Sequence, residues 1–317
     1  MKKIIALLLA AMLLLSFAGC GASSAAGTYT VGICQLVTHD ALDAATQGFQ
    51  DALVEKLGAD KVTFDLQNAA GDSATCASIA NAFVSNGVDL IMANATPALQ
   101  SASAATADIP ILGTSVTEYG VALGLEDFSG TVGGNISGTS DLAPLTEQAD
   151  MLAAWFPDAS NVGLLYCSAE ANSKYQVDTI KALLEEKGYT CELFAFADSN
   201  DMAAVTNACC EFSDVIYVPT DNAVASATDI IDGICRPAGV PIIAGEEGIC
   251  SGCGVATLSI SYYDLGYTTG EMAAKILTGE ADISTMPIAY APAVPKYNPE
   301  ICEDLGLTPP EGYAAIG

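Results

Sequence analysis

The N-terminal half of the chain alternates short apolar runs with helical patterns. The runs are rich in Val, Ile, Leu and Ala and predict buried strands at residues 29–36, 61–67, 89–93 and 110–113. Between them, apolar residues spaced three and four apart mark helices, the first of which carries Leu42, Phe49 and Leu53 on one face. Because strands that are apolar throughout must be covered on both faces, this pattern predicts a parallel sheet between two layers of helices.

The C-terminal half repeats this alternation. It predicts strands at residues 161–166, 191–196, 214–218, 241–244 and 255–260, and helices at 145–156, 202–210, 223–235 and 263–277. The tail, residues 286–317, is rich in proline and is expected to wrap the surface, with a short helix near 300–305. Two successive series predict a two-lobed α/β fold in which each lobe is a parallel sheet with helices on both faces.

The stretch between the two series, residues 133–144, is rich in Gly, Ser, Thr and Asp. It interrupts both the helical and the strand periodicity, which is typical of a loop. We expect it to be a crossover between the lobes. The alternative is an ordinary surface loop.

The N-terminus has the pattern of an export signal. Lys2 and Lys3 precede an apolar run, residues 4–15, that is too short for an ordinary membrane span. Ser16-Phe17-Ala18-Gly19-Cys20 resembles the lipobox of bacterial lipoproteins. We therefore expect residues 1–19 to be a signal peptide, Cys20 to carry a lipid and residues 20–27 to be a flexible tether, so that the protein is held on the extracytoplasmic face of the cell membrane. A plain secretory signal with a chance cysteine is the alternative.

Composition narrows the possible partners. The formal net charge of −28 disfavours binding to nucleic acid or to anionic lipid. Arg236 is the only arginine, so a bound carboxylate is expected to be held by backbone N–H groups and hydroxyls rather than by an arginine fork.

Signals for a metal site or for catalysis are weak. His39 is the only histidine and Cys250-Ser-Gly-Cys253 the only Cys-x-x-Cys, so neither a metal site nor a cofactor is expected. The two cysteines are interpreted either as a local disulfide or as inert thiols. His39 beside Asp40 could be half of a catalytic pair, but no hydrolase, nucleotide-binding or metalloprotease motif accompanies it, and the chain is not expected to be an enzyme.

Polar side chains follow nearly every predicted strand. In open parallel sheets, ligands bind beyond the carboxyl ends of the strands, although Ser, Thr, Asn and Asp at these places can also be helix caps. The candidate ligand-binding residues are Gln35, His39, Asn94, Thr96, Ser115, Thr117, Ser140 and Asp141 in the first series, and Glu170, Asn172, Thr220, Asp221, Asn222, Glu246 and Glu247 in the second.

Several of these residues lie in motifs that resemble a known family. The motifs are Gln35-Leu-Val-Thr-His39, Gly138-Thr-Ser-Asp-Leu-Ala-Pro144, Ser168-Ala-Glu-Ala-Asn-Ser173, Val218-Pro-Thr-Asp-Asn222, Gly245-Glu-Glu-Gly248 and Tyr262-Tyr-Asp-Leu-Gly266. Together they resemble the ABC-transporter substrate-binding lipoproteins of the tryptophan/tyrosine-binding type, which have the type I periplasmic-binding-protein fold.

The resemblance implies a Venus-flytrap with three crossovers, near residues 137–142, 253–256 and 283–288. Lobe one would then comprise residues 28–140 and 256–284, and lobe two residues 141–255 and 285–317. It also implies an ABC permease and an ATPase, encoded elsewhere, as partners.

The function expected from these observations is capture of a small amino-acid-like solute, possibly aromatic. Its ammonium group needs a carboxylate in a dry cleft, for which Glu170, Asp221 and Glu246 or Glu247 are candidates. Its carboxylate needs donors, which Thr96, Ser115, Thr117 and Ser140 can supply. A nucleoside or sugar carrier and a ligand-presenting sensor domain are the alternatives.

Overall fold

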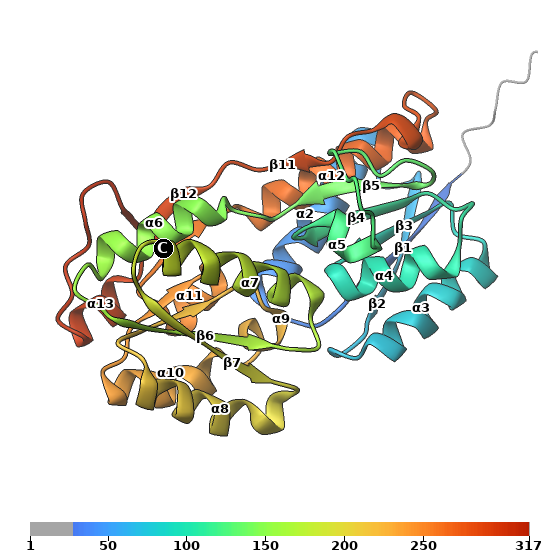
Figure 1. Ribbon diagram of the computed structural model, residues 1–317. Coiled ribbons are helices and arrows are strands. Elements are labelled where there is room, and N and C mark those ends of the chain that lie inside the picture. Colours follow the sequence, from blue (N-terminus) through green and yellow to red (C-terminus); the bar gives the residue numbers. More distant parts are fainter. Residues whose placement is uncertain (1–27, 317) are drawn as a thin grey trace, which may run out of the picture.

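The computed structural model describes residues 28–316 and shows two α/β lobes (Figure 1). The expected signal peptide (1–19), the lipid site at Cys20 and the whole of the tether (20–27) lie outside the described residues. Within residues 28–316, no helix has both the length and the apolar character needed to cross a membrane.

Lobe one, blue to green in Figure 1 apart from the orange to red segments α12 and β11, is built on a six-stranded sheet with the strand order β11-β5-β4-β3-β1-β2. Every neighbouring pair in this sheet is parallel. Its strands are β1 (Tyr29–Gln35), β2 (Val62–Asn68), β3 (Leu90–Asn94), β4 (Ile111–Val116), β5 (Ile136–Ser140) and β11 (Ala289–Tyr290). Its helices are α2 (Asp40–Leu57), α3 (Ser73–Asn86), α4 (Thr96–Ala105), α5 (Tyr119–Leu123), α12 (Tyr262–Leu277) and the 3-10 turn η1 (Ile283–Thr285).

Lobe two has a seven-stranded sheet with the order β13-β12-β10-β9-β8-β6-β7. All neighbouring pairs are parallel except β10 with β12. Its strands are β6 (Asn161–Cys167), β7 (Thr190–Phe196), β8 (Val215–Val218), β9 (Ile242–Ala244), β10 (Ala256–Ser259), β12 (Val294–Tyr297) and β13 (Ala314–Ala315). Its helices are α6 (Leu145–Trp155), α7 (Ala171–Glu186), α8 (Ser199–Phe212), α9 (Asn222–Ala225), α10 (Thr228–Ala238), α11 (Glu247–Cys253) and α13 (Pro299–Asp304).

Alternate residues of the central strands enter different cores. In β3, Leu90 and Met92 pack in a cluster with Phe49 of α2, whereas Ile91 belongs to a second cluster with Phe83 of α3. Since successive side chains of a strand point to opposite faces, the two clusters lie on the two sides of the sheet. The expected fold, a parallel sheet with helices on both faces, is confirmed for lobe one, and β6 shows the same division in lobe two.

The stretch at residues 133–144 differs from the expected loop, because it contains the buried strand β5. A hydroxyl of this strand finds its partners on other elements: the Thr139 hydroxyl is 3.1 Å from that of Thr114 in β4 and 2.9 Å from that of Thr269 in α12. At Gly138 φ is +146°, and an added Cβ would lie 2.0 Å from the Gly113 carbonyl oxygen, so only glycine fits. The Ser, Thr and Gly residues of this stretch are typical of a loop, but here they form a strand that packs closely against β4.

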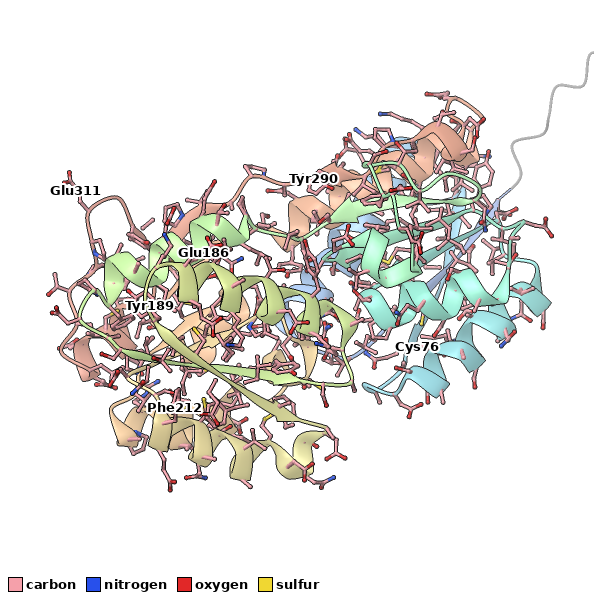
Figure 2. The ribbon with its side chains drawn as sticks, viewed as in Figure 1. Cys76, Glu186, Tyr189, Phe212, Tyr290 and Glu311 are labelled. Atoms are coloured by element: carbon pink, nitrogen blue, oxygen red, sulfur yellow. The ribbon has the colours of Figure 1, made fainter. Side chains whose placement is uncertain are left out.

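Two of the expected lobe boundaries also differ from the structure. Strand β10 was expected in lobe one, but it pairs with β9 and β12 in the sheet of lobe two. Strand β11 was expected in lobe two, but it pairs with β5 in the sheet of lobe one. Sheet membership is decided by hydrogen-bonding partners far away in sequence, so the chain changes lobes after Ser259 and after Tyr290. Figure 2 labels Tyr290 on the segment that leads from one lobe to the other.

Smaller differences concern lobe two. The helix expected at residues 223–235 is divided into α9 and α10, and the short helix α11 was not expected. The tail does more than wrap the surface: β12 and β13 extend the sheet, and α13 corresponds to the short helix expected near 300–305.

The helix that returns to lobe one, α12, packs against α2 with their backbones in close approach. A Cβ added at Gly266 would lie 1.9 Å from the carbonyl oxygen of Ala45. The absence of a side chain at Gly266 therefore sets the distance between the two helices.

Candidate ligand-binding site

The loops that follow the strands of the two sheets face each other across the boundary between the lobes (Figure 1). A pocket of about 320 Å³ lies there. Leu36, Val37 and Pro97 line it from lobe one, and Glu170 and Asn222 line it from lobe two. The pocket thus combines an apolar wall with polar groups from the opposite lobe, as small-molecule sites commonly do.

A direct hydrogen bond joins the lobes beside this pocket. His39, which precedes α2, lies with Nε2 3.3 Å from Oδ1 of Asn222 at the start of α9. Burial lowers the pKa of His39, which favours the neutral ring. His39 therefore forms a contact between the lobes.

The strand ends of lobe one carry polar atoms that lack partners. The side-chain oxygens Asn94 Oδ1, Thr96 Oγ1, Ser115 Oγ and Asp141 Oδ1 are buried and have no hydrogen-bond partner among residues 28–316, and their residues are not among those that line the pocket. Asn94 ends β3, Ser115 lies near the end of the adjacent strand β4, and Thr96 and Asp141 come just after β3 and β5. Because a buried polar atom without a partner is rare and costly, their concentration at neighbouring strand ends indicates a surface shaped to contact a ligand.

The distribution of such atoms supports this interpretation. Of the seven in the described chain, four lie at the strand ends of lobe one and a fifth, Asn172 Oδ1, lies at the start of α7 in lobe two. The remaining two belong to Trp155 and Thr257.

The backbone is strained at the same place. Ala95, just after β3, has φ of +94°, and Ser115, near the end of β4, has φ of +53°. Non-glycine residues seldom adopt these conformations, which are found most often where a site requires a particular geometry. The register of β4 against β5 also shifts between Gly113 and Val116, which re-aims the residues around Ser115.

On the lobe-two wall, the carboxylate of Glu170 is fully engaged. Oε2 accepts hydrogen bonds from Asn172 Nδ2 at 3.0 Å and from the backbone N–H and side-chain amide of Asn222 at 3.2 and 2.6 Å, and Oε1 accepts one from Ala223 N–H at 2.9 Å. Burial, together with the charge of Asp221, raises the pKa of Glu170 to about 7. Glu170 therefore holds the loop after β8 in position.

Asp221 and Glu246 are helix caps. Asp221 accepts from Val224 N–H of α9 at 3.0 Å and from Cys167 N–H at 2.7 Å. Glu246 accepts from the N–H groups of Gly248 and Ile249 at the start of α11. Burial raises the pKa of both carboxyls, that of Glu246 to about 7. The capping alternative recognised in the sequence therefore describes what these two carboxylates do in the structure.

Asp141 is placed differently. It follows β5, is 3 % exposed, and its Oδ2 accepts a hydrogen bond of 2.8 Å from the Tyr262 hydroxyl. Burial raises the pKa of Asp141, while the hydroxyls of Tyr262 and Thr117 oppose that shift. The charge of Asp141 also contributes to the raised pKa of Glu246.

The other candidate residues have internal partners. Gln35 bonds to Val37 O and to the side chains of Asp43 and Thr46, all within lobe one. Ser140 Oγ donates to Thr117 O, and Thr220 Oγ1 donates to Gly245 O. Glu247 accepts from Ser259 and from Lys296, the latter at 2.7 Å.

Sequence reasoning gave Tyr262 no role of its own. Its partner Asp141 is 121 positions away, and no local pattern reveals that contact. The apolar pocket residues Leu36, Val37 and Pro97 were likewise interpreted only as parts of a strand and a helix start. Their position just beyond strand ends is the one signal that could have identified them.

The structure leaves the cysteines as thiols. All ten within the described residues are free, and nine of them are buried. On α11, Cys250 Sγ lies 3.6 Å from Gly254 O and Cys253 Sγ lies 3.4 Å from Ile249 O, and burial raises the pKa of both thiols. The sequence left open whether Cys250 and Cys253 form a disulfide or remain as inert thiols; in the structure they are free, buried thiols. Residues 28–316 contain no group of three or more His, Cys, Asp or Glu side chains that could hold a metal ion.

Comparison with known proteins identifies the family. The sequence pattern of the family described as ABC transporter substrate binding protein matches residues 30–313. The tyrosine-binding protein of Clostridioides difficile (strain R20291) is 38 % identical over 260 residues, which is 81 % of this chain and 75 % of that protein.

Two solved structures extend the likeness to the whole fold. An ABC domain from Streptococcus pneumoniae in complex with L-Trp superposes with a TM-score of 0.86 at 32 % identity, covering 92 % of this chain and 100 % of that one. A substrate-binding protein with adhesive properties from Clostridium difficile, in a ligand-free, open structure, gives a TM-score of 0.69 at 38 % identity, covering 91 % and 99 % of the two chains.

The family match spans nearly the whole described chain, and the two-lobed architecture and the polar strand ends agree with it. The chain therefore belongs to the ABC transporter substrate-binding protein family.

Proposed function

We propose that this protein binds an amino acid with an aromatic side chain between its lobes and delivers it to an ABC importer. The observation that carries the proposal is the group of buried, unpartnered side-chain oxygens at the carboxyl ends of β3, β4 and β5 and at the start of α7. A polar ligand that bonds to these atoms would remove the cost of their burial.

The charge of the cleft favours a ligand with an ammonium group. Asp141, Glu170, Asp221 and Glu246 are all buried there, and none of them pairs with a lysine or arginine. Arg236 lies elsewhere, bonded to Asp232, Glu300 and Asp304. The ligand's carboxylate would then be held by hydroxyls such as those of Thr96 and Ser115, which are unpartnered.

The apolar pocket wall suits a large side chain. The volume of about 320 Å³ between Leu36, Val37 and Pro97 is large enough for an aromatic ring. The printed names of the relatives, one tyrosine-binding and one solved with L-Trp, support this choice.

The arrangement of the lobes supports binding by closure. The structure superposes better on the L-Trp complex, with a TM-score of 0.86, than on the ligand-free, open structure, with 0.69, although the latter is more similar in sequence. Closing two lobes around a ligand excludes water and converts binding into a change of shape that a permease can recognise.

The remaining parts of the proposal concern location and partners. We propose that Cys20 carries a lipid that anchors the protein on the extracytoplasmic face of the cell membrane, and that a separately encoded permease and ATPase complete the importer. The protein acts as a binding protein and has no catalytic role.

A thermal-shift screen of the purified protein against amino acids, nucleosides and sugars tests the ligand class. Binding to the folded state raises the melting temperature by an amount set by the ratio of ligand concentration to dissociation constant. We expect L-tyrosine or L-tryptophan to give the largest shift. A largest shift with a nucleoside or a sugar would contradict the proposal.

A further inference from the structure

We propose that Asp141 is the carboxylate that holds the ligand's ammonium group, and that the ligand thereby bonds directly to the hinge between the lobes. This inference rests on the proposed function, because it assumes an amino-acid ligand. It departs from the expectation that Glu170 and Asp221 fill this role.

The first step is an elimination among the buried carboxylates. A carboxylate offers about four positions for hydrogen-bond donors. Glu170 already accepts four hydrogen bonds, from Asn172, Asn222 and Ala223. Asp221 accepts a backbone N–H group on each of its oxygens, from Cys167 and from Val224. An ammonium group at either residue would displace bonds that shape the loops of lobe two.

Glu246 and Glu247 are also occupied. Glu246 uses both oxygens to cap α11. Glu247 has a side chain that is 32 % exposed and pairs with Lys296 at 2.7 Å. A partly exposed carboxylate that already has a cationic partner is a weak anchor for a second cation.

Asp141 alone combines burial with an oxygen that has no partner. The residue is 3 % exposed, and its Oδ1 has no hydrogen-bond partner among residues 28–316. Its Oδ2 is held by the Tyr262 hydroxyl at 2.8 Å, which fixes the orientation of the carboxylate. A buried carboxylate oxygen without a partner is a strong site for an ammonium group, because the charge is desolvated whether or not a cation is present.

The position of Asp141 connects this contact to closure. Asp141 is the first residue after β5, where the chain leaves lobe one, and Tyr262 begins α12, where the chain returns to lobe one. An ammonium group bound to Asp141 would therefore lie beside two of the places where the chain crosses between the lobes. The carboxylate of the amino acid would lie near Ser115 and Thr96, whose unpartnered hydroxyls lie near the end of β4 and just after β3.

The test compares, for each variant, the affinity for an amino acid with the affinity for the same molecule without its amino group. Calorimetric titration compares L-tyrosine with 3-(4-hydroxyphenyl)propanoate, which differs only in lacking the amino group, and L-tryptophan with indole-3-propanoate. We expect the wild-type protein to prefer the amino acid by about thirtyfold or more, since a buried charge pair is lost with the amine. In Asp141→Asn this preference should fall to within about threefold, mainly because the amino acid binds more weakly.

Two further variants complete the design. Asp178→Asn is the matched control, because Asp178 is exposed on α7 and pairs only with Lys174; it should keep the wild-type preference. If Asp141→Asn does not fold, Asp141→Ser replaces it, since serine is smaller and can still accept a hydrogen bond from Tyr262.

The possible outcomes distinguish amino-acid binding by the protein from the role of Asp141 in that binding. If the wild-type protein binds neither amino acid, the proposed function fails. If the wild-type protein binds an amino acid and the Asp141 variants keep the preference for the amine, this inference alone is overturned. Loss of that preference in Glu246→Gln, with the preference kept in Asp141→Asn, would also overturn it and would assign the ammonium to the opposite lobe.

Discussion

Substitution of Gly266 by alanine should destabilise lobe one, although alanine is the better helix former. The added Cβ would lie 1.9 Å from Ala45 O and 2.7 Å from Ala45 Cα, both backbone atoms of α2. Because a backbone cannot rotate away as a side chain can, α12 must move outward by roughly 1.5 Å to restore a normal contact distance. That movement would open the interface that buries Ala45 and Leu265.

The magnitude follows from two opposing effects. Alanine in place of glycine in a helix gains about 1 kcal/mol. Overpacking usually costs about 1–3 kcal/mol and more where neither side can yield, so we expect a net loss of about 2 kcal/mol or more. The corresponding fall in melting temperature is about 4–8 °C for a domain of this size.

Gly233→Ala is the matched control. Gly233 lies within α10, and nothing is within 4 Å of the position where its Cβ would be. In Gly233→Ala the added methyl group therefore meets no other atom, and the substitution only improves helix propensity. The melting temperature of this variant should rise by about 1–4 °C. Scanning calorimetry of both variants makes the comparison, with separate transitions if the lobes melt independently. A Gly266→Ala variant as stable as Gly233→Ala would refute the close backbone approach of α2 and α12.

Two further predictions concern the cleft carboxyls and the N-terminus. Burial raises the pKa of Glu246 to about 7, so its contribution to folding is fully present below the ordinary carboxyl pKa and is lost as pH rises through about 7. Between pH 4.5 and 7, unfolding of Glu246→Gln should depend less on pH than that of the wild type, by up to about 1.4 kcal/mol per pH unit; equal slopes would count against burial of an ionisable Glu246. The lipid proposed at Cys20 predicts that Cys20→Ser loses labelling by fatty acid and leaves the membrane fraction, and retained labelling would exclude that attachment site.

The sequence was sufficient for most of the fold, because short apolar runs such as that of β3 are typical of strands buried on both faces. It failed at β5, whose Ser137, Gly138 and Thr139 have the composition of a loop. These residues are stable in a strand only because Thr114 and Thr269 supply hydroxyl partners and β4 lies close to Gly138. Such partners are distant in sequence, and the same reason explains the misplaced boundaries at β10 and β11.

For the site, the sequence indicated the region but not the role of each atom. Polar residues at strand ends led to the expectation that a ligand binds there, and in the structure Glu170 and Asn222 are the candidates that line the pocket between the lobes. Whether a given acid is free depends on local hydrogen bonds: Asp221 and Glu246 cap helices, whereas Asp141 keeps one oxygen without a partner. A carboxylate that caps a helix and one that binds a ligand have the same sequence signal.

Calorimetric titration of the purified wild-type protein with L-tyrosine and L-tryptophan decides whether the cleft binds an aromatic amino acid. We expect saturable one-to-one binding of at least one of them, with a dissociation constant below about 100 µM, which corresponds to a binding free energy stronger than about −5.5 kcal/mol. Absence of binding by both amino acids, together with saturable binding of a nucleoside or a sugar, would contradict it.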